Sequence, residues 1–233
     1  MDDQHPLFKY SKYQNRGPVT LRIAIEEEEI VNPDLNVTYK INRYGFRSKD
    51  WTDNKEECYM VLGGSQTFGQ GIPEENRWSN LLEDHTGVTI YNLGYPAGAP
   101  DTVTRLLLGW VDEIKPSKIF VLWPNKHRWE IGRINGTKSY TPAMVHSIVN
   151  KYPDRWDSGY ILEHLGQEYN AEVNKIRNDY TFKGVCEERN IDYYTLNDMD
   201  FKHIDKRNAR DGKHNGVLFQ KAIADEFIKL LDK

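Results

Sequence analysis

The pattern of hydrophobic and polar residues divides the chain into two parts. Over residues 19–39 apolar and polar residues alternate in "VTLRIAIEEEEIV" and "NVTYKI", and the intervening "NPDLN" has the composition of a turn. This pattern predicts two short strands that form a hairpin. Residues 1 to about 17 show no clear period. We therefore expect residues 1–50 to form an arm and a small β-hairpin in front of the main domain.

From residue 51 to residue 233, short apolar runs alternate with helical patterns. The apolar runs that predict buried strands are 58–64, 88–94, 118–124 and 191–196. The helical patterns cover 73–87, 99–116, 161–190 and 216–233. This alternation predicts an α/β domain whose parallel sheet has helices on both faces. Residues 126–158, with several Trp, Pro and Gly, break the rhythm, and we expect an irregular insertion or lid there.

Charge and cysteine content narrow the functional classes. The net charge of -4 and the absence of a dense Lys/Arg block argue against a nucleic-acid-binding protein. Cys58 and Cys186 lie far apart and form no CxxC pair, which favours a reducing compartment. The sequence has no apolar core of signal-peptide length and no run long enough to span a membrane. We therefore expect a cytoplasmic protein that binds neither nucleic acid nor membrane.

The stretch "VLGGSQTFGQG" (61–71) ends a predicted strand and contains Ser65. A P-loop would need Lys and Ser or Thr where Gln70 and Gly71 stand, and an α/β-hydrolase elbow would need glycine where Thr67 stands. A dinucleotide-binding loop would need a third glycine, which is absent. Two interpretations stay open: a strand-to-helix turn with a capping serine, and a serine held as a nucleophile.

A nucleophilic serine needs a base, and the base needs a group that orients it. The segment "ARDGKHNG" supplies Asp211 and His214 in one loop before the last predicted helix. The alternative is a helix-capping Asp beside a surface His. Together with His203 these residues match no zinc spacing, so we expect neither a metal nor a cofactor.

Acyl transfer also needs hydrogen-bond donors for a developing oxyanion. Backbone N–H groups in "NLGYPAGAP", which contains Gly94 and Gly98, and the side-chain amide of Asn125 are candidates. The alternatives are two flexible loop glycines and a turn residue after Pro124. Ligand sites in parallel sheets lie beyond the carboxyl ends of the strands, where we expect these loops to converge with those of Ser65 and His214.

With these residues together, 58–233 resembles the SGNH (GDSL-type) hydrolase family. The matching blocks are "GGSQTFGQG", "NLGYPAGAP", "LWPNKH" and "DGKH", and the upstream "INRYGFRS" is similar to a lead-in seen before such domains. The resemblance implies a flavodoxin-like three-layer α/β/α fold with a parallel central sheet. Gly64 stands where the family has Asp, and the third block lacks the family's glycine.

The resemblance also assigns roles to residues. It implies that Ser65 is the nucleophile, His214 the base and Asp211 the residue that orients the base. It further implies an oxyanion hole formed by the Ser65 N–H, Gly98 and Asn125. No metal and no cofactor take part in this scheme.

The function implied by the resemblance is a serine esterase that cleaves small-acyl esters, often acetyl esters of carbohydrates. Gly94 and Trp129 are the candidate substrate contacts, and rings within 126–158 are expected to line the cleft or to pack as a lid. An O-acyltransferase would use the same triad. The departure at Gly64 favours a third reading, in which the chain is a binding or structural module with little or no catalysis. Self-association, or docking through the N-terminal arm, also stays open.

Overall fold

The computed structural model describes residues 28–32, 37–51, 56–132, 140–144, 161–201, 203–204, 209 and 214–233. Its centre is a sheet of parallel strands, in the spatial order β4-β3-β5-β8. The strands are β3 (Cys58–Gly63), β4 (Thr89–Asn92), β5 (Lys118–Trp123) and β8 (Asp192–Asn197). Numbered along the chain, these four strands lie in the sheet in the order 2-1-3-4, as in a flavodoxin-like sheet. The predicted strands and their parallel arrangement are confirmed.

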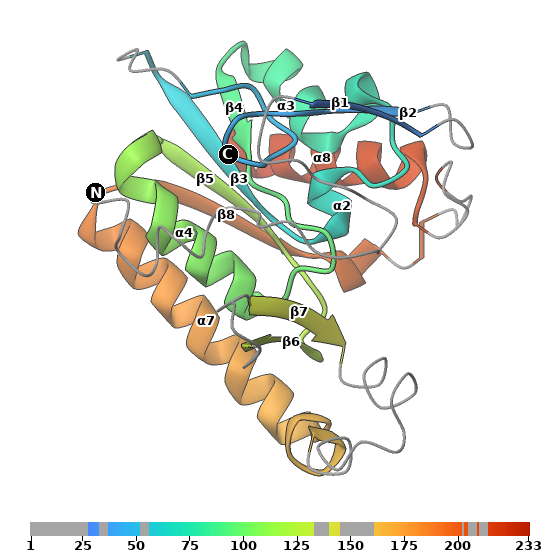
Figure 1. The fold of residues 1–233 in the computed structure, drawn as a ribbon. Coiled ribbons are helices and arrows are strands. Elements are labelled where there is room, and N and C mark those ends of the chain that lie inside the picture. The colour runs from blue at the N-terminus through green and yellow to red at the C-terminus, as the bar shows by residue number, and fades with distance from the viewer. Residues whose placement is uncertain are drawn as a thin grey trace.

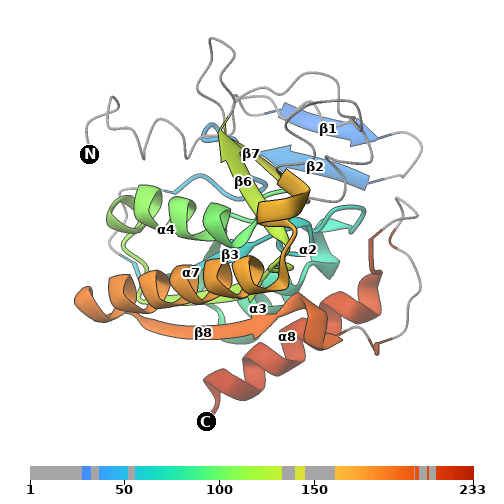
Figure 2. The ribbon, with the colours of Figure 1, turned by 90° about the horizontal axis from the view of Figure 1, so that it is seen from below.

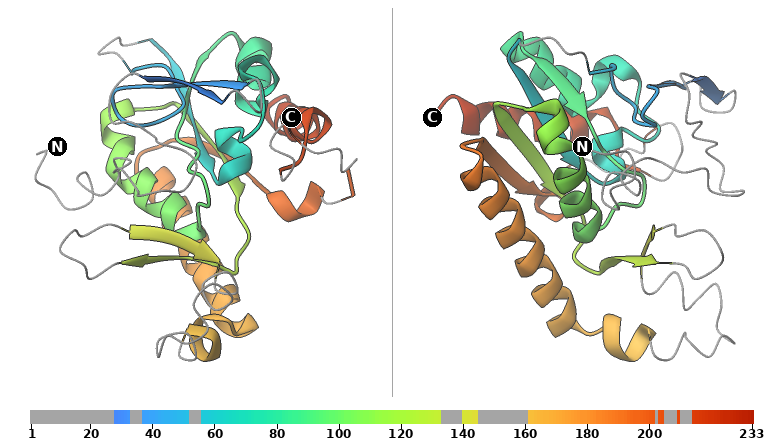
Figure 3. Two further views of the ribbon diagram at one scale, coloured as in Figure 1. Left: turned by 45° about the vertical axis from the view of Figure 1, so that its right-hand side comes forward. Right: turned by 60° about the vertical axis from the view of Figure 1, so that its left-hand side comes forward.

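Helices cover both faces of this sheet, as predicted (Figure 1). One face carries α4 (Pro100–Ile114) and α7 (Glu168–Glu188), which lie side by side, and the other carries α3 (Trp78–Thr86) and α8 (Val217–Leu231). The chain runs outward from β3 to β4 through α3 and returns past β3 to β5 through α4. Right-handed crossovers in opposite directions place these helices on opposite faces. The predicted three-layer α/β/α arrangement is therefore confirmed (Figure 3).

Short helical segments complete the described chain. A single turn, α2 (Ser65–Phe68), follows β3, and the 3-10 turn η1 (Glu74–Asn76) precedes α3 within the predicted helix 73–87. The π-helical turn η2 (Ile161–Leu165) precedes α7, and the 3-10 turn η3 (Asp198–Phe201) follows β8. None of the described helices is both long and apolar enough to cross a membrane.

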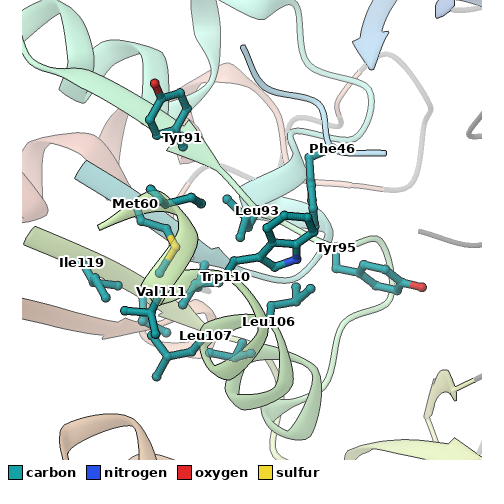
Figure 4. Close-up of a cluster of buried hydrophobic side chains, with 14 of the residues drawn as sticks. Phe46, Met60, Tyr91, Leu93, Tyr95, Leu106, Leu107, Trp110, Val111 and Ile119 are labelled. Atoms are coloured by element: carbon teal, nitrogen blue, oxygen red, sulfur yellow. The ribbon is translucent and has the colours of Figure 1, made fainter. Parts of the chain in front are cut away.

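Alternate residues of each strand enter different cores. Met60, Ile119 and Val121 belong to the core under α4, which also contains Trp110. Figure 4 shows part of this cluster, with Met60, Leu106, Leu107 and Trp110 close together. The intervening residues enter the core under α3 and α8; they include Tyr59, Val61, Phe120 and Leu122. Because both faces are covered, every residue of β3 is buried and its sequence reads as a continuous apolar run.

The predicted N-terminal hairpin is confirmed in its backbone pairing. β1 (Glu28–Asn32) pairs antiparallel with β2 (Val37–Ile41), and Figure 2 shows β2 beside α2. β2 and the residues after it are part of the main core. Tyr39 is 1% exposed, and the ring of Trp51 lies 4.8 Å from that of Trp110. The ring of Phe46 lies 5.7 Å from that of Trp110 (Figure 4). The division of the chain into 1–50 and 51–233 stays a prediction, but the residues just before 51 are packed into the α/β core.

The expected irregular insertion contains a regular element. β6 (Arg128–Gly132) pairs antiparallel with β7 (Tyr140–Met144), so the prediction of irregular structure is wrong over these strands. Two polar contacts fix β6 to α4: Arg105 Nε lies 2.7 Å from Glu130 Oε1, and the Glu130 N–H donates to Asp101 Oδ2 at 3.2 Å. Contacts between residues far apart in the chain leave no periodic pattern in the sequence. The local composition, rich in Trp, Pro and Gly, is that of a loop.

Candidate active site

The loops that follow β3, β4 and β5 are in contact at the carboxyl edge of the sheet. A Cβ atom placed on Gly64 would lie 3.4 Å from Cβ of Pro124 and 3.6 Å from the carbonyl oxygen of Gly98. A Cβ atom on Gly98 would lie 3.3 Å from Cα of Gly64. The order of the strands explains this meeting point: β4 is added on one side of β3 and β5 on the other, and ligand sites lie at the carboxyl ends of the strands where the strand order reverses in this way. The expected convergence is confirmed for these loops.

Ser65 is the first residue of α2 and is 8% exposed. The N-cap of this helical turn is Gly64, and no side chain forms a capping hydrogen bond. The interpretation of Ser65 as a capping serine is therefore wrong. Its carbonyl closes the turn by accepting the N–H groups of Gly69 and Gln70 at 3.0 and 3.1 Å. The hydroxyl is thus presented at a tight turn and has no role in holding that turn together.

Asn92 fixes α2 against the end of β4. Its buried side-chain amide donates to the carbonyl of Thr67 and to the hydroxyl of Ser79, both at 2.8 Å, and its Oδ1 accepts the N–H of Gly94 at 2.8 Å. A Cβ atom on Gly94 would lie 2.3 Å from the backbone N of Phe68, so the close approach of α2 excludes any side chain there. A substrate contact by Gly94 stays a prediction. Asn92 does not stand out in the sequence, where its only signal is its place at the end of a predicted strand.

Arg47 supports the other side of the same turn. Its guanidinium donates to the carbonyls of Gly69 at 2.6 Å and Ile72 at 2.9 Å, and it forms an ion pair with Glu74 at 3.1 Å. Burial, together with the charge of Arg77, lowers the pKa of Arg47 to about 9, and Glu74 opposes this shift. The motif "INRYGFRS" therefore places a buried cation directly behind the segment that follows Ser65.

Asn125 forms a turn after β5. Its Oδ1 accepts the N–H of His127 at 2.9 Å, and its carbonyl accepts the N–H of Arg128 at 3.0 Å. The interpretation of Asn125 as a turn residue is confirmed. Its Nδ2 lies 3.8 Å from Sδ of Met199, a weak contact that leaves the amide available as a donor. The role of Asn125 in an oxyanion hole stays a prediction.

The N–H of Gly98 closes a turn by donating to the carbonyl of Tyr95 at 2.8 Å. An oxyanion contact from this N–H would require the turn bond to be shared or broken. The Ser65 N–H, at the first position of α2, has no partner within its helix because the first N–H groups of a helix have none. Ser65 is therefore the better placed of these two backbone donors, and both assignments stay predictions.

His214 lies two residues before Gly216, the N-cap of α8, and its carbonyl accepts the N–H of Ala209 at 2.7 Å. Asp211 lies outside the described residues. No hydrogen bond between Ser65 and His214 is present among the described residues. The helix that follows His214 does reach α2: the Gln220 Nε2 donates to the carbonyl of Gln66 at 3.0 Å.

Gln220 is completely buried and joins the helices around the candidate nucleophile. Its Oε1 accepts the N–H of Trp78 at 3.0 Å, so the same side chain holds α8 to α2 and to α3. Residues 154 positions apart in sequence are thereby brought together. The loop that carries His214 is tethered, within a few residues, to the neighbour of Ser65.

Two further candidates are Trp129 and His203. Trp129 is half-buried in β6, and its Nε1 is buried without a hydrogen-bond partner. His203 lines a cavity of about 340 Å³ between β8, η3 and α8, together with Phe201 and Glu226. This cavity is not lined by Ser65, Gly98, Asn125 or His214. Within the described part of the chain, no group of three or more His, Cys, Asp or Glu side chains can hold a metal ion.

No protein-family model matches the sequence, and no curated protein matches it. Among solved structures, the chain is similar to the psychrotrophic esterase EstA from Pseudoalteromonas sp. at 16% identity and a TM-score of 0.40, covering 76% of this chain and 100% of that one. A member of the lipolytic G-D-S-L family from Veillonella parvula matches at 11% identity and a TM-score of 0.39, covering 76% and 100%.

A carbohydrate esterase family 2 enzyme from Corynascus thermopiles, with a carbohydrate-binding domain, matches at 11% identity and a TM-score of 0.40, covering 78% of this chain and 67% of that one. Identities and TM-scores this low do not establish a shared activity. A function for the present chain has to come from its own residues.

Proposed function

We propose that the protein is a serine esterase that cleaves small-acyl esters, with acetyl esters of carbohydrates as the first substrates to test. The observation that carries the proposal is the position of Ser65. It opens a one-turn helix at the carboxyl end of β3, it does not cap that helix, and the loops after β4 and β5 touch the residue before it. A serine in a sharp strand-to-helix turn at this edge is the arrangement that exposes a nucleophile.

In the proposed reaction, Ser65 Oγ attacks the ester carbonyl while His214 accepts its proton. Asp211 orients the imidazole and stabilises its protonated form. The N–H of Ser65, the amide of Asn125 and the Gly98 loop stabilise the oxyanion. Collapse of this intermediate releases the alcohol, which takes the proton from His214, and leaves an acyl group on Ser65. Water, deprotonated by His214, then releases the acid. The Gly94 loop and Trp129 are the proposed walls of the cleft.

The test compares wild type with Ser65→Ala, and uses Ser117→Ala as a matched control. Ser117 precedes β5 at the opposite edge of the sheet, where its hydroxyl donates to Glu57 at 2.8 Å. We expect Ser65→Ala to lower the hydrolysis of 4-nitrophenyl acetate by about 10³-fold or more, since the members of a catalytic triad act as a unit. A fluorophosphonate probe should label Ser65 in wild type and in Ser117→Ala.

Two other outcomes are informative. If neither hydrolysis nor probe labelling depends on Ser65, the esterase proposal is wrong and a binding module without catalysis is the better account. If an added sugar alcohol collects the acetyl group faster than water does, the same Ser65-dependent chemistry serves acyl transfer. Acetylated xylose and acetylated N-acetylglucosamine, compared with 4-nitrophenyl acetate, test whether carbohydrate improves kcat/KM.

A further inference from the structure

Arg128, the first residue of β6, differs from the other arginines of the described residues. Arg47 and Arg77 are buried, Arg105 is partly buried, and each is paired with a glutamate. The described residues provide Arg128 with no hydrogen bond or ion pair through its guanidinium, and its Nε is buried without a partner. Burying a charge without a partner is costly, and each such group in a folded protein needs an explanation.

The position of Arg128 relates it to the candidate nucleophile. Its backbone N–H donates to the carbonyl of Asn125 at 3.0 Å, and a turn of this kind keeps its ends within about 7 Å. The residue before Asn125 is Pro124, whose Cβ is 3.4 Å from the position of a Cβ atom on Gly64. Arg128 thus lies in the same turn after β5 as Asn125, and Pro124, the residue just before this turn, lies next to Gly64.

The strand that carries Arg128 is held in place. Glu130, on the same strand, is tied to α4 through Arg105 and Asp101. The side chain of Arg128 therefore projects from a fixed element at the same edge of the sheet. A charged group on a rigid element can orient a ligand more accurately than one on a loose loop.

The two cations of this turn, Arg128 and Lys126, differ in how they meet nearby carboxylates. Burial lowers the pKa of the Arg128 guanidinium, and the negative charge of Asp198, at the start of η3, opposes this shift. The neighbouring Lys126 is paired with Glu168 and Glu172 on α7. Lys126 is therefore held in ion pairs, whereas Arg128 has the attraction of Asp198 but no hydrogen bond or ion pair from the described residues.

We propose that Arg128 binds an anionic oxygen group, a carboxylate or a phosphate, on the ester substrate. A guanidinium offers a planar pair of donors that matches either group. This inference deepens the esterase proposal and rests on it: the substrate class becomes small-acyl esters that carry a negative charge beyond the scissile bond. Arg128 then determines substrate specificity and takes no part in the chemical step.

The experiment uses 4-acetoxybenzoate and its neutral counterpart, methyl 4-acetoxybenzoate, with 4-acetoxyphenyl phosphate as the phosphate probe. Wild type is compared with Arg128→Met, Arg128→Lys and the control Lys126→Met, which removes the same charge two residues away. In Arg128→Met we expect kcat/KM for the anionic esters to fall about tenfold to a hundredfold, as for a lost charge-assisted hydrogen bond. The neutral ester should change less than about threefold, and Arg128→Lys should restore part of the loss. The larger of the two anionic effects identifies carboxylate or phosphate.

A second readout separates this inference from the esterase proposal. Calorimetric titration of the Ser65→Ala protein with 4-acetoxybenzoate measures binding without hydrolysis, and this binding should weaken when Arg128→Met is added. Three outcomes would each overturn the role of Arg128. In the first, Arg128→Met lowers kcat/KM equally for charged and neutral esters; in the second, Lys126→Met lowers it as much as Arg128→Met does. In the third, the Ser65→Ala protein binds the anionic ester no better than the neutral one. Ser65-independent hydrolysis with Arg128-dependent binding would overturn the esterase and leave the anion site standing.

Discussion

Replacing Arg47 by methionine tests whether the N-terminal motif holds the segment behind Ser65. The change removes the buried guanidinium and leaves the carbonyls of Gly69 and Ile72 without their donor. A buried polar group that loses its partner costs about 1–3 kcal/mol, so these carbonyls together contribute roughly 2–6 kcal/mol. The ion pair with half-exposed Glu74 adds little, because solvent screens it. Relief of the desolvation of Arg47 offsets part of the loss. We expect a net destabilisation of about 3 kcal/mol.

In a protein of this size, about 3 kcal/mol corresponds to a decrease in Tm of roughly 6–12 °C. The assay is thermal and urea unfolding followed by circular dichroism. The control is Arg43→Met, which removes an exposed arginine paired with Asp50 in the same motif. If the esterase proposal holds, Arg47→Met should also impair catalysis at temperatures where the protein is still folded. There kcat should fall by a larger factor than KM rises, because the turn that follows Ser65 loses its shape. A Tm decrease no larger than that of Arg43→Met would refute the reasoning.

Further expectations concern the contacts around α2 and the buried thiols. Gly94→Ala should reduce both Tm and Ser65-dependent hydrolysis, measured together, because the added methyl group meets the backbone of Phe68. Gln220→Leu should destabilise the fold by about 1–3 kcal/mol in urea unfolding, because it leaves the N–H of Trp78 buried and unpaired, and Gln220→Glu should retain part of that stability. Burial raises the pKa of Cys186 to about 12, so iodoacetamide at pH 8 should modify it in the unfolded protein and barely in the native one.

The pattern of apolar runs was sufficient for the α/β domain because every central strand is covered on both faces. Strands of this kind are short, continuous and bounded by Gly or Pro, as in "CYMVLGG" and "KIFVLWP". The strands β6 and β7 could not be predicted in the same way. β6 is held by contacts to α4, such as that between Arg105 and Glu130, and a short window of sequence does not reveal such a contact between distant residues.

The same distinction applies to the candidate site. Ser65, Gly98 and Asn125 could be proposed from their positions after strands. Arg47 and Gln220 could not, because a charged or amide side chain in a sequence gives no sign of being buried. Their burial becomes visible only when the carbonyls that they contact, at Gly69 and Gln66, are placed in space. The groups that shape the site therefore lie in segments whose sequence predicts an N-terminal extension and an ordinary terminal helix.

Gly64, one of the positions where the chain departs from the SGNH family pattern, can be considered as a problem of geometry. Its φ of −89° is open to any residue, and an added Cβ would make ordinary contacts with Pro124 and Gly98. The preceding Gly63 is different, because its φ of 157° and a Cβ contact of 2.1 Å with Thr67 exclude a side chain. The backbone thus requires glycine at 63 and not at 64. The absence of a carboxylate before Ser65 is therefore a chemical difference from the family pattern, since the turn itself would accommodate the first atom of that side chain.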